Sequence, residues 1–186
     1  MKRLLRSLRS LLRADGGIAY VEFAIALPFL LALFLGAVDV TRYILITQKV
    51  EKVSVTVSDL VAQYQSMSTS QLNNLIIAAG QVMQPYPFGA SGYVIVTSVT
   101  KTGTNQPVVN WQYTGGGSWT KPSRIGTPGA QATLPAGFTM NDKDNIIIAE
   151  VFYNYAPLIV NGVVSQSAIY RTAIYRPRLG ALNSLS

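Results

Sequence analysis

The sequence contains no cysteine and no histidine, and only 12% of its 186 residues are charged. The absence of cysteine excludes a disulfide framework, a thiolate nucleophile and a cysteine-ligated metal site. The absence of histidine removes the usual general base near neutral pH and one of the commonest transition-metal ligands. We therefore expect a protein that is not an enzyme and that uses no cofactor and no metal.

Basic charge is concentrated at the amino-terminal end. The formal net charge is +7, and residues 1–17 contribute +4 of it through five basic side chains and one acid (Lys2, Arg3, Arg6, Arg9, Arg13 and Asp15). The other basic residues are scattered without an aromatic stacking platform, so the sequence does not favour nucleic-acid binding. Residues 1–17 are instead typical of a short basic leader.

A long apolar run follows this leader. Residues 18–38 read IAYVEFAIALPFLLALFLGAV, and about 20 apolar residues are enough to cross a bilayer as a helix. The run is longer than the apolar region of an ordinary signal peptide, and no A-x-A-like cleavage site follows it. Because basic residues prefer the cytoplasmic flank of a span, we expect a single-pass inner-membrane protein with residues 1–17 in the cytoplasm and the C-terminal two thirds in the periplasm.

Glu22 is the one charged residue within the apolar run. A charged side chain at the centre of a membrane helix costs about 2.5–3.5 kcal/mol, and less near the interface. If a peptidase cut after Gly17, Ile18 would carry a free ammonium group and Glu22 would become the fifth residue. That ammonium could pair with Glu22 of a neighbouring subunit, whereas without cleavage the carboxylate would have to reach the interface or be protonated.

The residues Gly17-Ile-Ala-Tyr-Val-Glu22-Phe23 resemble the processing motif of type IV pilin-like proteins. A glutamate followed by an aromatic residue is similar to the motif of the Tad (tight adherence, Flp-type) pilus system, and the chain length favours its TadE/TadG-like pseudopilins over the shorter Flp pilins. The resemblance runs through residues 20–43 and, more loosely, residues 58–63 and 146–159.

The resemblance implies a minor pilin or pseudopilin that is structural and not catalytic. It implies cleavage by a prepilin peptidase between Gly17 and Ile18, with Glu22 and Phe23 acting in processing and assembly. The implied partners are the inner membrane, the prepilin peptidase, the major Flp-type pilin, other pseudopilins and inner-membrane assembly proteins. The alternative is an uncleaved signal-anchor protein that presents a β-rich domain for adhesion or envelope scaffolding.

Helical periodicity continues beyond the apolar run. Apolar residues at spacings of three and four predict a helix that extends through residues 39–66, ending near Gln65, with one buried stripe. The stripe consists of Val50, Val53, Val57, Leu60, Val61 and Tyr64. A second helix is expected from an N-cap at Ser70 to the prolines at 85 and 87, with Leu72, Leu75, Ile76 and Ala79 on its apolar face.

The rest of the chain is rich in β-branched and aromatic residues. Strands are expected at residues 93–100, 108–113, 146–155 and 163–175, with Asn161-Gly162 as a two-residue hairpin turn. We therefore predict an α+β fold: a long transmembrane helix followed by an extracytoplasmic domain, residues 67–186, in which an antiparallel sheet packs on the helices as in pilins.

Residues 114–145 are rich in glycine and proline and predict an irregular loop, which is either wholly loop or includes short strands. Trp119 and Phe138 are expected to pin it to the core in preference to forming an adhesive surface. The strings Ser118-x-x-Lys121 and Lys101-Thr-Gly occur in the wrong order for a penicillin-binding enzyme. Residues 141–145 lack the glycine and the glutamate of a calcium loop.

Overall fold

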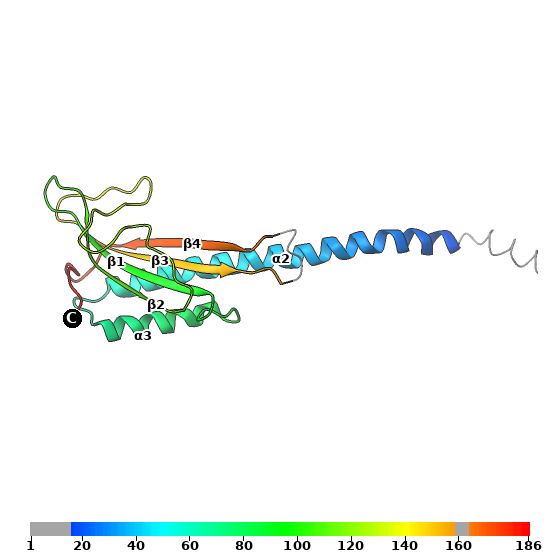
Figure 1. Ribbon diagram of the computed structural model, residues 1–186, viewed down its shortest axis with the longest axis horizontal. Coiled ribbons are helices and arrows are strands. Elements are labelled where there is room, and N and C mark those ends of the chain that lie inside the picture. The colour runs from blue at the N-terminus through cyan, green and yellow to red at the C-terminus, as the bar shows by residue number, and fades with distance from the viewer. Residues whose placement is uncertain (1–15, 159–163) are drawn as a thin grey trace, which may run out of the picture.

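The computed structural model describes residues 16–158 and 164–186, and it has the α+β architecture predicted from the sequence. A long helix, α2 (Gly16–Ala62), is followed by a shorter helix, α3 (Thr69–Gly80), and a 3₁₀ turn, η1 (Gln81–Met83). Figure 1 shows one half of α2 lying along a sheet and the other half extending away from it as a bare stem. Residues 1–15 of the leader and the Asn161-Gly162 turn lie outside the described residues.

The helix α2 is 47 residues long, and it continues without interruption through Pro28. At 1.5 Å per residue its length is roughly 70 Å. Its second half packs on the sheet through residues spaced three and four apart, which are fully or almost fully buried (Ile46, Val50, Val53, Val57 and Val61). The periodicity of this segment therefore predicted its buried face.

Two residues of the predicted stripe are nevertheless exposed. Leu60 is 38% exposed because the buried face is rotated away from it, towards Ser54 and Ser58, which are completely buried. Tyr64 is exposed because α2 ends at Ala62, three residues before the predicted end, so the helical periodicity no longer sets its direction.

The N-cap of α3 is Ser68, and the prediction of Ser70 is wrong by two residues. The Ser68 hydroxyl accepts a hydrogen bond from the Gln71 N–H at 3.2 Å, and the Gln71 side chain accepts one from the Ser68 N–H at 2.9 Å. This reciprocal capping box requires a Glu or Gln three residues after the cap. Ser70 is followed by Asn73 at that distance and cannot form it.

The sheet is fully antiparallel and has the strand order β2-β1-β3-β4. Its strands are β1 (Gly92–Thr100), β2 (Val108–Gly115), β3 (Asn145–Tyr155) and β4 (Ser167–Tyr175). All four predicted strands are present with boundaries shifted by a few residues, the largest shift being the later start of β4. Because side chains alternate along a strand, Ile147, Ala149 and Val151 of β3 face the helices while Ile146 and Ile148 face the other way.

The second face of the sheet is covered by the glycine- and proline-rich loop between β2 and β3. Three loop residues are buried there against the strands (Ile125, Ala132 and Met140), and Phe138 packs against the same cluster. The loop has no strand of its own, but it forms one isolated β-bridge, between Val108 and Gln131. The central strands are therefore buried on both faces, which explains the nearly continuous apolar run of β3.

The C-terminal residues close the end of the domain farthest from the stem. The Leu182 carbonyl accepts hydrogen bonds from the Trp111 indole N–H at 2.8 Å and from the Ser98 hydroxyl at 2.7 Å. The Arg178 N–H donates to the carbonyl of Ala62 at 2.8 Å, at the end of α2. The tail therefore joins the last turn of α2 to the edge of the sheet.

Two adjacent isoleucines of α3 test directly how this helix packs against the core. Ile76 is completely buried and Ile77 is 53% exposed. We expect Ile76→Ala to lower the free energy of unfolding by about 2–5 kcal/mol, because it leaves a cavity in the core. Ile77→Ala removes the same atoms and should cost less than about 1 kcal/mol. Urea titration of both variants checks this, and equal losses would contradict the packing of α3.

Candidate membrane anchor and processing site

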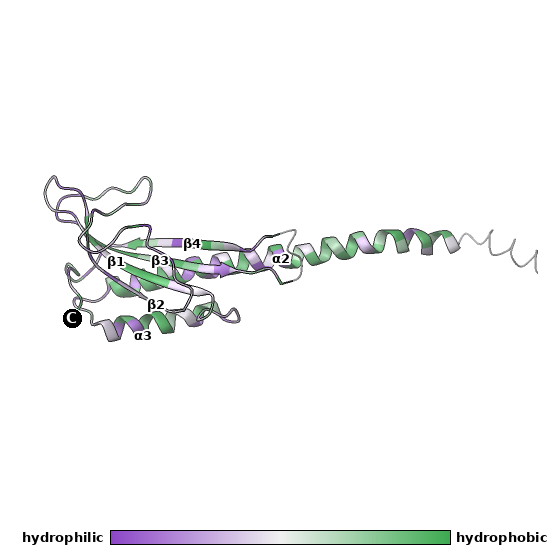
Figure 2. Cartoon of the chain, viewed as in Figure 1, coloured by the Kyte–Doolittle hydropathy of each residue, from purple (hydrophilic) through white to green (hydrophobic). Residues whose placement is uncertain are grey.

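The stem of α2 from residue 18 to 34 has little protein packed around it. Every residue from 18 to 34 is exposed, although nearly all are apolar. Only 6% of the most apolar 18-residue window of this helix is buried against the rest of the protein. Figure 2 shows the hydrophobic colouring continuing to the free end of the stem. By length and composition the stem is able to cross a membrane, and lipid or other helices would cover side chains that water would otherwise contact.

Gly17 and Ile18 lie in the first turn of α2. No atom lies within 4 Å of the position that a Cβ at Gly17 would occupy, so the fold does not require a glycine there. Ile18 is 60% exposed. The bond between Gly17 and Ile18 therefore lies on an open helical segment, and packing against the domain does not explain why residue 17 is a glycine.

Glu22 and Phe23 lie one turn further along the stem. Phe23 is 58% exposed, and the Glu22 carboxylate forms no hydrogen bond or ion pair with any residue in the described part of the chain. A carboxylate in a membrane helix is costly without a partner. The folded chain alone does not supply that partner.

Asp39 lies where the stem meets the rest of the protein. This aspartate is completely buried, and its Oδ1 accepts a hydrogen bond from the Leu158 N–H at 3.0 Å. The Tyr155 hydroxyl donates to the Asp39 carbonyl at 3.1 Å, and the Tyr155 ring packs edge-on against Tyr43 with centroids 5.1 Å apart. Burial, and after it the charge of Asp39, raise the pKa of Tyr155. These contacts fasten the end of β3 to α2, one residue after the apolar run.

A second buried carboxylate, Glu150, anchors the loop between β2 and β3 on the second face of the sheet, the face away from the helices. It accepts hydrogen bonds from the Ser123 hydroxyl, the Arg124 N–H at 2.9 Å and the Tyr170 hydroxyl at 3.1 Å. Burial, and after it Glu150, raise the pKa of Tyr170 to about 12. The Arg124 guanidinium lies 4.0 Å from the centroid of the Tyr170 ring. These contacts tie the loop to β3 and β4.

The two aromatic side chains of the loop, Trp119 and Phe138, pack differently. Phe138 packs, as expected, against the hydrophobic cluster that the loop forms on the second face of the sheet. Trp119 belongs to neither hydrophobic cluster, and the Lys121 ammonium lies 4.8 Å from the centroid of its ring. The expectation that both aromatics pin the loop to the core therefore holds for Phe138 and not for Trp119.

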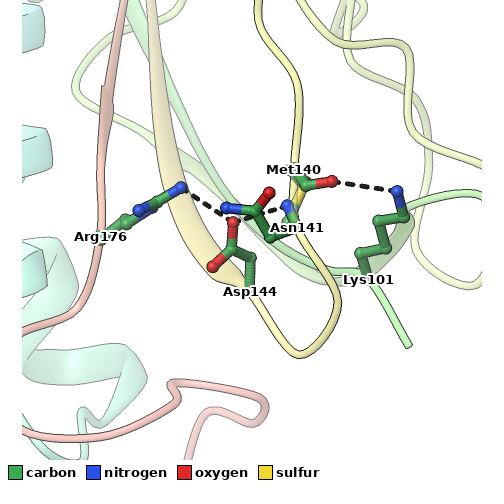
Figure 3. A network of polar contacts seen from close by, with 5 residues as sticks. All are labelled: Lys101, Met140, Asn141, Asp144 and Arg176. Carbon is green, nitrogen blue, oxygen red and sulfur yellow. Dashed lines mark hydrogen bonds and ion pairs between the residues drawn. The ribbon is translucent and has the colours of Figure 1, made fainter. Parts of the chain in front are cut away.

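The side chains set aside as weak catalytic and calcium motifs have ordinary partners. The Ser118 hydroxyl donates to the Gly89 carbonyl at 3.4 Å. Figure 3 shows the Asp144 carboxylate accepting hydrogen bonds from Arg176 and from the Asn141 N–H, both at 2.8 Å, while Lys101 donates to the Met140 carbonyl at 3.0 Å. Within residues 16–158 and 164–186, no three Asp or Glu side chains cluster as metal ligands.

In the part of the chain that the structure describes, one apolar helix projects from an α+β domain, which suggests a membrane anchor. Residues 17–56 match the family model of the TadE-like proteins. The match is consistent with a TadE-like protein of the Tad pilus system, and that family is a structural pilus component and not an enzyme family. Comparisons with curated proteins and with solved structures gave no match.

The matched segment starts at Gly17 and includes all four residues singled out from the sequence: Gly17, Ile18, Glu22 and Phe23. It also includes the junction at Asp39. Residues 58–63 and 146–159, where the sequence suggested a weaker resemblance, lie outside the match.

Proposed function

We propose that the chain is a minor pilin or pseudopilin of a Tad-type pilus and that it contributes structurally to pilus assembly. The observation that carries the proposal is the Glu22 carboxylate, which has no partner in the described residues and lies in a stem whose apolar side chains from residue 18 to 34 are all exposed. A stem of this kind suits a helix that packs against other helices in lipid. The TadE-like match over the same residues supports the assignment.

In this proposal a prepilin peptidase cuts between Gly17 and Ile18 and removes the basic leader. The new ammonium of Ile18 then pairs with Glu22 of a neighbouring subunit. Pairing offsets the cost of both charges in a medium of low dielectric constant, where either one alone is strongly unfavourable. Because the pair forms only at one stagger of the two helices, it also sets their register.

The chain would then divide into a cytoplasmic leader (1–17), a transmembrane helix (18–38), a helix extension (39–66) and a periplasmic domain (67–186). The basic leader favours this orientation. The proposed partners are the prepilin peptidase, the major Flp-type pilin, other pseudopilins and the inner-membrane assembly proteins. After processing, the subunit enters a pilus at the cell surface.

The amino terminus of the protein from its native envelope tests this proposal. N-terminal sequencing combined with intact-mass measurement should find a chain that starts at Ile18. A chain that starts at Met1 would contradict the proposed maturation. It would support the alternative of an uncleaved signal-anchor protein that presents its β-rich domain for adhesion or envelope scaffolding.

A further inference from the structure

A groove of about 460 Å³ lies where α2 leaves the apolar stem and enters the domain. One wall is a face of α2, formed by residues three and four apart. The other wall is Tyr86, which belongs to the segment after η1. The groove therefore exists only when the domain is folded against α2. Its lining includes Phe34, Val38, Thr41, Arg42, Leu45 and Tyr86.

The lining of the groove changes in chemistry along α2. Phe34 and Val38 make the end nearer the membrane apolar, Thr41 and Arg42 add a hydroxyl group and a cation one turn further on, and Leu45 continues the wall beyond them. The guanidinium of Arg42 lies 5.7 Å from the centroid of the Tyr86 ring, a distance at which the ring face attracts a cation. The half-buried Arg42 side chain is therefore held in place in the groove, one turn beyond its apolar end.

Arg42 has no counter-ion in the described part of the chain. Arg171, Arg176 and Arg178 each lie within 4.0 Å of a carboxylate oxygen. Among the described residues the guanidinium groups of Arg42 and Arg124 instead each lie over a tyrosine ring without an ion pair. The fixed charge of Arg42 is thus available to an anion from outside the protein. A guanidinium presents several N–H donors in a geometry that matches phosphate oxygens.

The depth of Arg42 indicates which anion would reach it. Arg42 lies four residues beyond Val38, the last residue of the apolar run, which is about 6 Å along a helix. The headgroup layer on each side of a bilayer is roughly 5–7 Å thick. Arg42 therefore lies level with lipid phosphates, while Phe34 lies within the hydrocarbon. Tyr86 occupies the interfacial level at which aromatic side chains are favoured.

We propose that this groove binds one phospholipid of the outer leaflet of the inner membrane. Arg42 and the Thr41 hydroxyl bind its phosphate, and one acyl chain lies along Phe34 and Val38. The inference rests on the membrane insertion included in the proposed function, and it is independent of leader cleavage and of Glu22.

A second copy of the stem fits the groove less well than a lipid. Residues 18–38 contain one acid, Glu22, which is 20 residues from Arg42. In a parallel neighbour in register this carboxylate is about 30 Å away along the helix axis. A neighbouring stem would thus cover the apolar end and leave the Arg42 charge without a counter-ion.

The test measures lipid retained by the full chain. The protein is placed in phosphatidylcholine nanodiscs that contain a minor fraction of phosphatidylglycerol, extracted with mild detergent, and analysed for bound lipid by native mass spectrometry. The wild type should retain one phospholipid per chain. Arg42→Gln should lower that retention about tenfold, since it removes a charge-assisted hydrogen bond. Arg42→Lys should restore most of the retained lipid. That result would show that the loss in Arg42→Gln comes from the missing charge and not from misfolding.

Lys52→Gln is the matched control, because Lys52 is an exposed cation further along α2 and outside the groove. It should retain lipid like the wild type. Equal retention by Arg42→Gln and the wild type would overturn the proposal, as would a loss of self-association without a loss of lipid. Co-sedimentation with vesicles measures insertion separately, and the mature amino terminus reports on processing, so failure of the groove is distinguishable from failure of the proposed function.

Discussion

Replacing Gly17 with leucine is expected to stop removal of the leader while the protein remains inserted in the membrane. The folded structure gives no reason for a loss of stability, because the space around the Gly17 Cα is open and leucine is more favourable than glycine in a helix by roughly 0.7 kcal/mol. A bulky side chain next to the proposed cleavage site, however, would prevent the proposed glycine-specific peptidase from acting. The variant should therefore accumulate with residues 1–17 attached, as intact-mass measurement of membrane fractions would show.

Gly16→Leu is the control for the position of the cut. Residue 16 would leave with the leader if the cut follows Gly17, so this variant should give a mature chain with the wild-type mass. A mature mass that includes residue 17 would mean that the cut falls before Gly17. Wild-type maturation of Gly17→Leu would contradict the proposed site.

Replacing Glu22 with glutamine is expected to leave insertion and leader removal unchanged and to reduce incorporation into pili at least tenfold. The substitution preserves the shape of the side chain, but in the proposed pairing it leaves the Ile18 ammonium of the neighbouring subunit without a counter-charge. Removing one partner from a desolvated ion pair costs about 3–5 kcal/mol, and each 1.4 kcal/mol corresponds to a factor of ten in an equilibrium constant. Immunoblots of sheared pilus fractions and of membranes measure the partition.

Glu51→Gln makes the same chemical change on the same helix. Glu51 is exposed and forms only a surface ion pair with Arg171, at 3.9 Å, and such pairs contribute about 0–1 kcal/mol. Its partition between membranes and pili should match the wild type. If Glu22→Gln also matched the wild type, the carboxylate would have no role in setting the register of the stems.

Local patterns in the sequence predicted most of the fold. The apolar stem, the buried stripe through Val50, Val53, Val57 and Val61 and the existence of all four strands follow from the periods of a helix and a strand. Most of the errors lie near the ends of helices. The cap of α3 shifts to Ser68 because Gln71 completes a capping box, and Leu60 is exposed because the domain covers a slightly different face of α2.

The outer layer of the domain was harder to predict from the sequence. Ser123, Arg124 and Tyr170 meet at Glu150 only after the loop folds over the sheet, and these residues are 20 to 27 positions from Glu150. No local pattern encodes a contact at that separation. One signal was available, since a strand as apolar as β3 needs both of its faces covered.

The candidate site likewise has one part that local sequence patterns identify and another that depends on the fold. Gly17, Ile18, Glu22 and Phe23 are close together in the sequence, so a local motif is enough to identify them, and the TadE-like match covers all four. The groove at Arg42, by contrast, depends on the fold. Tyr86 is 44 positions away from Arg42 and reaches it only because α3 and η1 return along α2.

The contact between the Ile18 ammonium and Glu22 of a neighbouring chain can be measured directly in assembled material. Chains carrying ¹⁵N-labelled isoleucine are mixed with chains carrying ¹³C-labelled glutamate before assembly, so that solid-state NMR transfer between the two labels arises only across subunits. The proposed pairing predicts transfer from a free amine nitrogen to a glutamate side-chain carboxyl, and Glu22→Gln in the ¹³C-labelled chains should abolish it. An Ile18 nitrogen that remains an amide, or an amine without transfer to a neighbouring carboxylate, would contradict the pairing and the mode of assembly built on it.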